Sequence, residues 1–170
     1  MIKRLAIIPA RGGSKRIKNK NLKIFFGKPL IYYSILAAKK SKIFSKIHVS
    51  SDSSKILNYV KNLNVHTEFK RPKNLSNDFV GIHKVLKYVV KKYKKLNYNF
   101  DEIWLLYPTN PFINFSTIRE CKRKFSNINS KPENSLITVT KYNYPVKWAQ
   151  KINNRNILSP INKHNLKIRS

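Results

Sequence analysis

Residues 5–16 (LAIIPARGGSKR) join an apolar run to a basic loop that contains two glycines. The apolar run predicts a short buried strand over residues 4–9. Gly12 and Gly13 have no Cβ atom, so the backbone N–H groups around them can approach a ligand closely. We therefore predict a strand that leads into an anion-binding loop, which spans residues 10–21 and is called the cradle below.

The cradle is rich in cations, with Arg11, Lys15, Arg16 and Lys20 around its glycines. Such a set matches a polyphosphate better than a neutral ligand, and the planar guanidinium of Arg11 can bind two phosphate oxygens at once. The spacing differs from the Walker A motif and from the G-x-G-x-x-G dinucleotide motif. The cradle thus predicts a nucleoside triphosphate as ligand, although its sequence matches neither of these two phosphate-binding motifs.

Further along the chain, predicted strands alternate with predicted helices. The strands span residues 4–9, 47–50, 65–69, 103–107 and 135–140, and the helices span residues 29–40, 56–63, 82–93 and 116–126. Residues 153–156 predict a turn in a β excursion, and the apolar run 103–107 predicts a buried central strand. The alternation indicates an α/β fold with a Rossmann-like, mostly parallel sheet, in which ligands bind at the carboxyl ends of the strands.

The charge balance suggests a competing function. The chain has 36 Lys and Arg against 7 Asp and Glu, a net charge of +29 that attracts phosphate backbones of any kind. The lysines are spread over every segment, however, and no helix-turn-helix, zinc-finger, RRM or KH pattern accompanies them. A basic nucleic-acid-binding protein is therefore the less favoured alternative, and we expect nucleic acid to bind only non-specifically.

The sequence also bears on the cellular compartment. It contains no run of 18 apolar residues, and its first residues lack the pattern of a signal peptide. We expect a cytoplasmic protein without a membrane partner.

Residues 7–21 (IIPARGGSKRIKNKN) resemble the signature of the CMP-N-acylneuraminate synthetases, the acylneuraminate cytidylyltransferase family. Residues 49–52 (VSSD), 71–78 (RPKNLSND) and 105–112 (LLYPTNPF) are similar to further motifs of that family. Tyr107 and Phe112, with residues 142–146 and 168–170, favour the branch that activates pseudaminic acid. The resemblance covers essentially the whole chain and implies the nucleotide-diphospho-sugar transferase type of α/β fold.

The resemblance implies that the anomeric hydroxyl of a nine-carbon sugar acid attacks the α-phosphate of CTP, giving a CMP-sugar and pyrophosphate. The predicted catalytic residues are Arg11 and Lys20, which would neutralise the negative charge that builds up on the phosphate oxygens. The nucleotide-binding residues are Ala10, Arg11, Gly12, Gly13, Ser14, Lys15, Lys20, Asn21, Asp52 and Arg71. The sugar acid is assigned to Tyr107, Thr109 and Arg169, with Arg71 or Arg169 near its carboxylate.

Two carboxylates have alternative interpretations. Asp52 follows a predicted strand and precedes a helix, so it is either the N-cap of that helix or part of the nucleotide site. Asp78 either fixes its loop or caps the helix that begins near Gly81.

The resemblance also implies Mg²⁺, which needs hard oxygen ligands. The chain holds no D-x-D pair, so no metal ligand is assigned within it. In the family, such a pair lies beyond the point where this chain stops. We therefore expect residues 1–170 to form a single nucleotidyltransferase domain that is incomplete at its C-terminus, and the full-length protein to be a homodimer. The alternative is a truncated relative that binds CTP but turns it over weakly or not at all.

Overall fold

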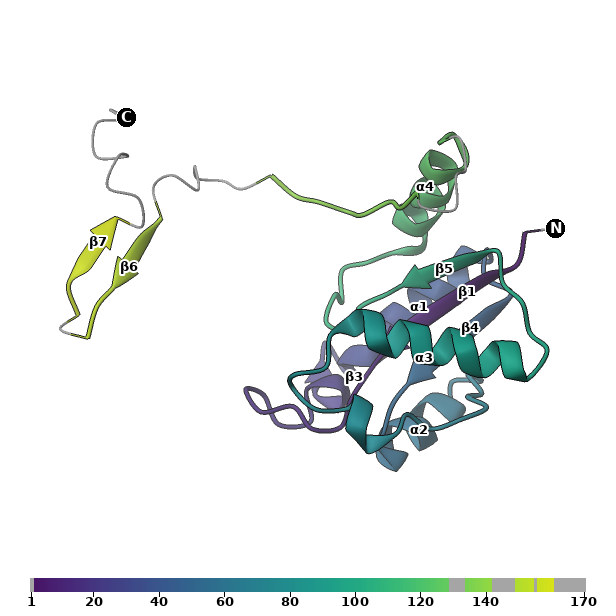
Figure 1. The fold of residues 1–170 in the computed structure, drawn as a ribbon, viewed down its shortest axis with the longest axis horizontal. Helices are drawn as coiled ribbons and strands as arrows, with labels where there is room; N and C mark the ends of the chain where they lie inside the picture. The colour runs from purple at the N-terminus through teal and green to yellow at the C-terminus, as the bar shows by residue number, and fades with distance from the viewer. Residues whose placement is uncertain (1, 129–133, 142–148, 155, 161–170) are drawn as a thin grey trace. The chain divides into compact units, whose positions relative to one another are not determined.

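The computed structural model describes residues 2–128, 134–141, 149–154 and 156–160, and it divides into two compact units. The first unit, Met1–Pro132, carries the sheet, the helices and the cradle (Figure 1). The second unit, Glu133–Ser170, contains a short hairpin.

The first unit is built on a three-stranded parallel sheet in the order β4-β1-β5. Its strands are β1 (Arg4–Pro9), β4 (Lys46–Ser50) and β5 (Glu102–Leu105). The central strand is β1, and the prediction that residues 103–107 form the central strand is wrong. In β5, Ile103 is 40% exposed, whereas Leu5, Ile7 and Ile8 of β1 are fully buried. An apolar run can indicate that a segment forms a strand of a sheet. Whether that strand is central or at the edge depends on which other strands pair with it.

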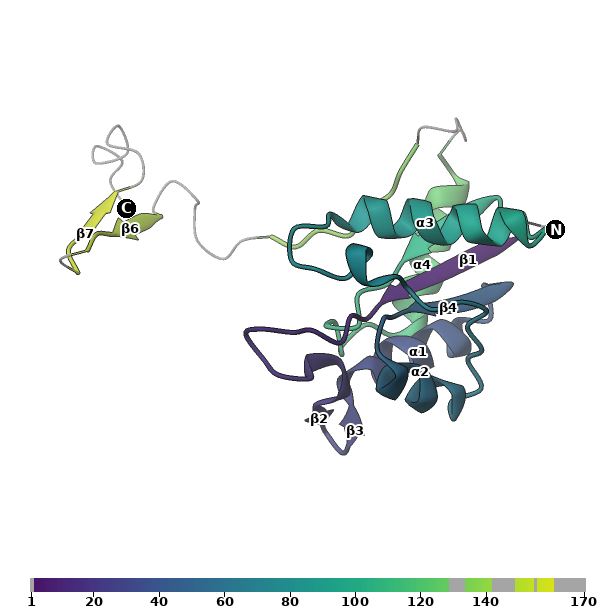
Figure 2. The same ribbon diagram turned by 60° about the horizontal axis from the view of Figure 1, so that its bottom comes forward.

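Helices cover both faces of this sheet (Figure 2). They are α1 (Leu30–Ser41), α2 (Ser54–Lys61), α3 (Ile82–Lys95) and α4 (Phe115–Ser126). Side chains of β1 alternate between the faces, as the geometry of a strand requires. Ala6 and Ile8 belong to a core cluster with residues of α1, α2 and α4, while Leu5 and Ile7 cluster with α3. The predicted α/β fold with a parallel sheet and flanking helices is confirmed.

Short elements join the main ones. The 3-10 helix η1 (Lys20–Leu22) ends the cradle, and the small hairpin of β2 (Ile24–Phe25) and β3 (Lys28–Pro29) leads into α1. A second 3-10 helix, η2 (Lys73–Leu75), precedes α3. Among the described residues, none of the helices has the length and apolar character of a membrane span.

Two predicted strands are absent from the described residues. Residues 65–69 form no strand, because the Val65 N–H bonds back to the Val60 carbonyl at the end of α2 instead of pairing with the sheet. Residues 135–140 form no strand either, and Ile137 and Val139 are about four-fifths exposed, at 78% and 83%. Both segments have the apolar pattern of a strand, but neither pairs with a strand among the described residues.

The second unit contains an antiparallel hairpin of β6 (Gln150–Ile152) and β7 (Leu158–Pro160). The turn predicted over residues 153–156 lies between these strands, and Asn156 adopts a positive φ of 57°. The Asn153 side chain accepts a hydrogen bond from the Ile157 N–H at 3.0 Å. The described residues of the turn thus confirm the β excursion.

Candidate active site

A cavity of about 340 Å³ opens at the carboxyl ends of β1 and β5. Helix α1 connects β1 to β4 on one face of the sheet, and α3 lies between β4 and β5 on the other face. From β1 the chain first passes to β4 on one side and later returns to β5 on the other side. The gap between the ends of β1 and β5 is therefore the topological switch point of the sheet, where open α/β sheets bind ligands. The cavity is lined by Pro9, Arg11, Ser14, Lys20, Asn21, Arg71, Leu75, Asn77, Asp78, Val80, Ile82, Val85, Tyr107, Pro108 and Thr109.

Seven of the predicted site residues meet in this lining, from segments far apart in the sequence. They are Arg11, Ser14, Lys20 and Asn21 of the cradle, Arg71 of the loop before η2, and Tyr107 and Thr109 after β5. Ala10, Gly12, Gly13, Lys15 and Asp52 lie outside the lining. The predicted grouping of cradle and strand-end residues is therefore observed for these seven, while the role of each toward a ligand stays a prediction.

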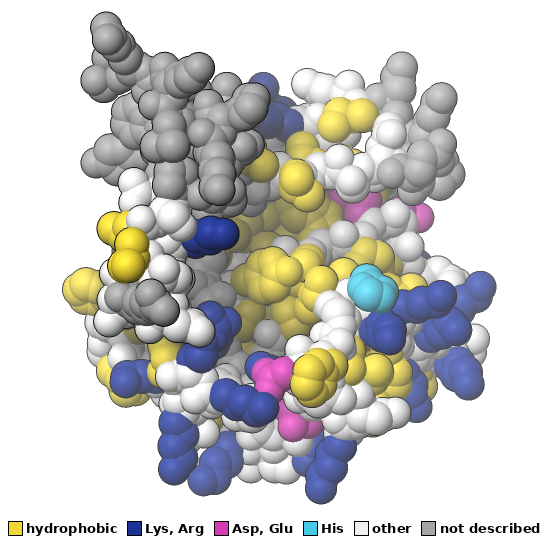
Figure 3. Space-filling model, turned by 60° about the vertical axis from the view of Figure 1, so that its left-hand side comes forward, with side chains coloured by type: hydrophobic (Ala, Val, Ile, Leu, Met, Phe, Trp, Pro, Cys, Tyr) yellow, Lys and Arg dark blue, Asp and Glu magenta, His cyan; other side chains and the backbone are white. Residues whose placement is uncertain are grey.

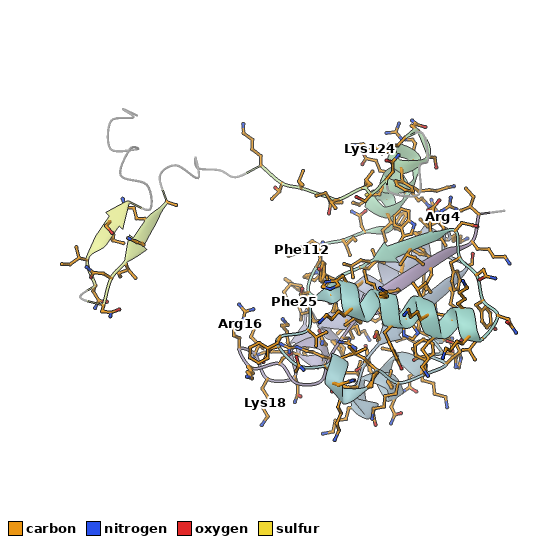
Figure 4. All side chains as sticks on the ribbon, in the orientation of Figure 1. Arg4, Arg16, Lys18, Phe25, Phe112 and Lys124 are labelled. Atoms are coloured by element: carbon orange, nitrogen blue, oxygen red, sulfur yellow. The ribbon has the colours of Figure 1, made fainter. Side chains whose placement is uncertain are left out.

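The cations of the cradle differ in position. Lys20 is partly buried at the cavity wall, whereas Lys15 lies outside the lining with its side chain 81% exposed. Arg16 and Lys18 are exposed and lie at the outer tip of the loop, directed away from the sheet (Figure 4). The cavity wall thus receives only part of the charge that the sequence places in this loop.

Asp52 contacts the cradle backbone. Its Oδ1 accepts a hydrogen bond from the Gly12 N–H at 2.9 Å. The N-cap of α2 is Ser53, so the interpretation of Asp52 as the N-cap is wrong. On the other side of the loop, Asn21 Nδ2 donates to the Arg11 carbonyl oxygen at 3.0 Å. Two side chains that were assigned to the nucleotide therefore also hold the loop.

Asp78 supplies a counter-charge to the cradle. Its carboxylate pairs with the Arg11 guanidinium and with Lys15, the latter at 3.0 Å between Oδ2 and Nζ. The hydrogen bonds from Arg11 and then Lys15 hold the pKa of the Asp78 carboxyl below its usual range. The N-cap of α3 is Gly81, so Asp78 fixes the loop and does not cap that helix.

Acidic side chains are scarce around these cations. Figure 3, which is turned toward this side of the molecule, shows Lys and Arg side chains spread over the described surface with few Asp or Glu among them. An anionic ligand therefore meets a surface of mostly one sign.

Arg71 is buried beside the cavity, with only 5% of its surface exposed. Its Nε donates to Ser50 Oγ at 3.1 Å, its Nη2 donates to the Ser50 carbonyl, and its backbone N–H donates to the Ser51 carbonyl at 2.8 Å. Burial lowers the pKa of the Arg71 guanidinium, while the nearby Asp52 carboxylate opposes this shift. These bonds tie the loop before η2 to the end of β4 and bring a cation to the cavity wall.

Ser34 was not predicted and supports the β5 side of the site. It is fully buried in α1, and its Oγ donates to the Tyr107 carbonyl oxygen at 2.9 Å. The bond holds the chain where it leaves β5 and enters the cavity wall. No signal in the sequence could have found it, because the two residues are 73 positions apart.

Phe112 lies away from the cavity lining. Its ring packs against Phe25 of β2, with centroids 5.9 Å apart, and 79% of the residue is exposed (Figure 4). Arg169, residues 142–146 and residues 168–170, which also entered the predictions, lie outside the described residues.

The carboxylates of the described chain do not fit a Mg²⁺ site. Asp52 is bonded to the Gly12 N–H, and Asp78 is paired with two cations. Among the described residues, no three His, Cys, Asp or Glu side chains form a group that could hold a metal ion. Asp52 and Asp78 therefore organise the loops of the site, and no chemical step is assigned to a metal at them.

A parallel α/β sheet with a cation-lined cavity at its switch point defines a class of nucleotide-binding proteins. Within that class, residues 5–166 match the family model described as "Cytidylyltransferase". The chain belongs to the cytidylyltransferase family, and the resemblance to the acylneuraminate cytidylyltransferases is confirmed.

Similar proteins fall within this family. The pseudaminic acid cytidylyltransferase of Campylobacter jejuni is 36% identical over 99% of this chain and 72% of its own length. The CMP-N,N'-diacetyllegionaminic acid synthase of Legionella pneumophila is 31% identical over 92% of this chain and 66% of its own length.

A solved structure has a similar fold. It is the CMP:2-keto-3-deoxy-manno-octonic acid synthetase complexed with CTP, with a TM-score of 0.60 at 20% identity. The match covers 74% of this chain and 48% of the synthetase. At this identity the likeness supports the fold alone.

Proposed function

We propose that this protein transfers the cytidylyl group of CTP to a nonulosonic acid, with pseudaminic acid or a related acylneuraminate as acceptor. The observation that carries the proposal is the cavity at the β1/β5 switch point, whose wall presents Arg11, Lys20 and Arg71 in a chain of the cytidylyltransferase family. The nature of the acceptor is supported by the names of the relatives and by Tyr107 in the cavity wall.

In the proposed reaction, the anomeric hydroxyl oxygen of the sugar acid attacks the α-phosphorus of CTP. A bond forms between that oxygen and phosphorus, the bond from phosphorus to the bridging oxygen breaks, and pyrophosphate leaves with the electron pair. The hydroxyl proton passes to solvent. Arg11 and Lys20 offset the negative charge that develops on the phosphate oxygens, and the cavity holds the two reactants in line.

Asn21 is suited to the nucleoside end of CTP. The residue is only 4% exposed, and its Oδ1 has no hydrogen-bond partner among the described residues. A buried acceptor without a partner costs free energy, so a ligand that donates an N–H or O–H to it is favoured. An amino or hydroxyl group of cytidine provides such a donor.

The acceptor side of the cavity is assigned to Tyr107 and Thr109, which follow β5. Arg169 is proposed as a partner of the sugar-acid carboxylate. The family resemblance further implies Mg²⁺, which would supply additional charge neutralisation on the phosphates, and a homodimer.

The experiment measures pyrophosphate release from CTP and Mg²⁺ with pseudaminic, legionaminic and N-acetylneuraminic acids, and with ATP, GTP or UTP in place of CTP. Release only with CTP and with one or more of these acids is expected. Lys20→Met should lower kcat/KM by about 100-fold, because one positioned charge is lost from the cavity wall. Lys18→Met is the matched control, since Lys18 is an exposed lysine of the same loop.

Three other results would contradict the proposal. Equal losses in the two lysine variants would show that only the overall charge of the loop matters. CTP binding in a calorimeter without pyrophosphate release would select the alternative of a binding-only relative. Tight RNA or DNA binding with no preference for CTP would select the nucleic-acid alternative.

A further inference from the structure

The peptide group between Arg11 and Gly12 is held at both ends by side chains. Its carbonyl oxygen accepts a hydrogen bond from Asn21 Nδ2 at 3.0 Å, and its N–H donates to Asp52 Oδ1 at 2.9 Å. Asn21 belongs to η1 and Asp52 follows β4, so the two contacts come from different elements. Because a peptide group is planar, hydrogen bonds to both of its ends fix its rotation about the chain.

Gly12 is required for this arrangement by its surroundings. A Cβ atom at Gly12 would lie 2.9 Å from Ser53 Cβ, closer than real Cβ contacts. At Gly13, by contrast, an added Cβ would meet nothing within 4 Å. The first glycine of the pair therefore lets the cradle approach the loop after β4 closely enough for the Asp52 bond to form.

The same contacts determine which loop N–H groups remain for a ligand. The Gly12 N–H is used by Asp52, and the Ser14 N–H donates to the Gly12 carbonyl at 3.1 Å. The Ala10 N–H donates to the Ser50 carbonyl at 2.9 Å and extends the pairing of β1 with β4. These three N–H groups of the cradle are therefore already bonded within the protein, and the side chain of Arg11 projects from the held peptide into the cavity wall.

We infer that Asp52 is a positioning residue, not a ligand of the nucleotide. Its carboxylate is the acceptor that orients the Arg11–Gly12 peptide. Through that peptide it fixes where the Arg11 side chain leaves the backbone on its way to the phosphates of CTP, while Asp78 pairs with the guanidinium at the far end of the side chain. The inference rests on the proposed function for the identity of the ligand. The contact itself, between Asp52 Oδ1 and the Gly12 N–H, does not depend on it.

Two substitutions separate the acceptor role from a role of the charge. Asp52→Asn keeps an Oδ1 acceptor but removes the negative charge, whereas Asp52→Ala removes both. We expect Asp52→Asn to retain kcat/KM for CTP within about three-fold of the unaltered protein, and Asp52→Ala to lose about 10- to 100-fold, as for other residues that orient a ligand-contacting group. Ser53→Ala is the matched control in the same loop, because it keeps the Cβ atom beside Gly12.

A second measurement reads the contact without turnover. Hydrogen exchange of the Gly12 amide, followed by NMR, should be slow in the unaltered protein and in Asp52→Asn, and fast in Asp52→Ala. A far-UV circular dichroism spectrum like that of the unaltered protein shows that Asp52→Ala is folded.

The outcomes distinguish the inference from the proposed function. If Asp52→Asn loses as much activity as Asp52→Ala, the charge of Asp52 matters and the positioning role is overturned. Unchanged activity and unchanged Gly12 exchange in Asp52→Ala overturn it as well. If the unaltered protein neither binds CTP nor releases pyrophosphate, the proposed function fails, and Gly12 exchange still decides whether Asp52 holds the cradle.

Discussion

Lowering the pH from 7 to 5 is expected to remove about 2 kcal/mol from the free energy of unfolding through one histidine, His48. This residue lies in β4, contacts Tyr93 of α3, and is fully buried. Its Nδ1 lies 3.0 Å from the Tyr93 hydroxyl, which donates its single proton to Glu68. Nδ1 of His48 is therefore the donor to Tyr93, and its Nε2 is a buried atom with no partner among the described residues.

The environment of His48 strongly disfavours its protonated form. Burial lowers the pKa of His48 from 6.5 to about 3; the Glu68 carboxylate opposes this shift, and the charges of Arg71 and Lys46 add to it. Burial alone would raise the pKa of Glu68, but hydrogen bonds from Lys46 and Tyr93 keep it below its usual value. The cluster therefore holds a neutral imidazole beside an ionised carboxylate.

The direction of the pH effect on stability follows from the pH at which the folded and the unfolded protein each bind a proton at His48. The unfolded chain binds a proton at His48 as the pH falls below 6.5, but the folded protein does so only near 3. Between these values the unfolded state binds more protons, so stability falls by about 1.4 kcal/mol for each unit of pH decrease. The contribution of His48 is complete above pH 6.5 and is lost as the pH falls towards 3.

The test compares the unaltered protein with His48→Gln, which does not titrate and keeps an N–H that can donate to Tyr93. Urea unfolding at pH 7 and pH 5, at constant ionic strength, gives the free energy of unfolding at each pH. The difference between the two pH values should be about 2 kcal/mol smaller in His48→Gln than in the unaltered protein. His66→Gln, at an exposed histidine, is the control. An equal pH dependence in His48→Gln and the unaltered protein would refute the reasoning.

Three further predictions concern other parts of the first unit. Asn114→Ala should cost about 1 kcal/mol of stability, because Asn114 Oδ1 accepts a hydrogen bond from the Thr117 N–H at the start of α4. Ser53→Ala should cost less, because Ser53, the N-cap of α2, makes no side-chain capping hydrogen bond. Urea unfolding of the two variants measures the difference. Glu102→Ala should cost about 3 kcal/mol in the same assay, because it leaves Arg4, only 7% exposed, without its two-point ion pair; a loss no larger than that of Asn114→Ala would contradict this. Asp78→Asn should tighten CTP binding in a calorimeter, because the carboxylate no longer competes with phosphate for two cradle cations; weaker binding would mean that Asp78 holds those cations in place for the ligand.

Local pattern was sufficient for much of the fold. The apolar run of β1 and the helical spacing in α3 predicted both elements nearly to their observed ends. The same kind of pattern failed for residues 65–69 and 135–140, because strand formation depends on a neighbouring strand and not only on apolar residues. The apolar run 103–107 likewise predicted a central strand, whereas β5 lies beside β1 at the edge of the described sheet.

The candidate site also has features that the sequence predicted and features that it did not. Motifs in the sequence predicted which cations and strand ends meet at the cavity, since parallel strands bring their carboxyl ends to one edge of the sheet. They did not predict that Asp52 accepts the Gly12 N–H, that Asp78 pairs with Arg11, or that Ser34 holds the Tyr107 carbonyl.

The class of fold, the family, and the basic, glycine-containing character of the cradle could all be predicted from the sequence. These properties depend on residue type and short-range spacing, which are visible along the chain. The three-dimensional contacts were needed to show which carboxylates pair with the cradle cations, which side chains hold the cradle backbone, and which of its cations reach the cavity. Such contacts join residues tens of positions apart, and their directions depend on the packing of helices and loops around β1.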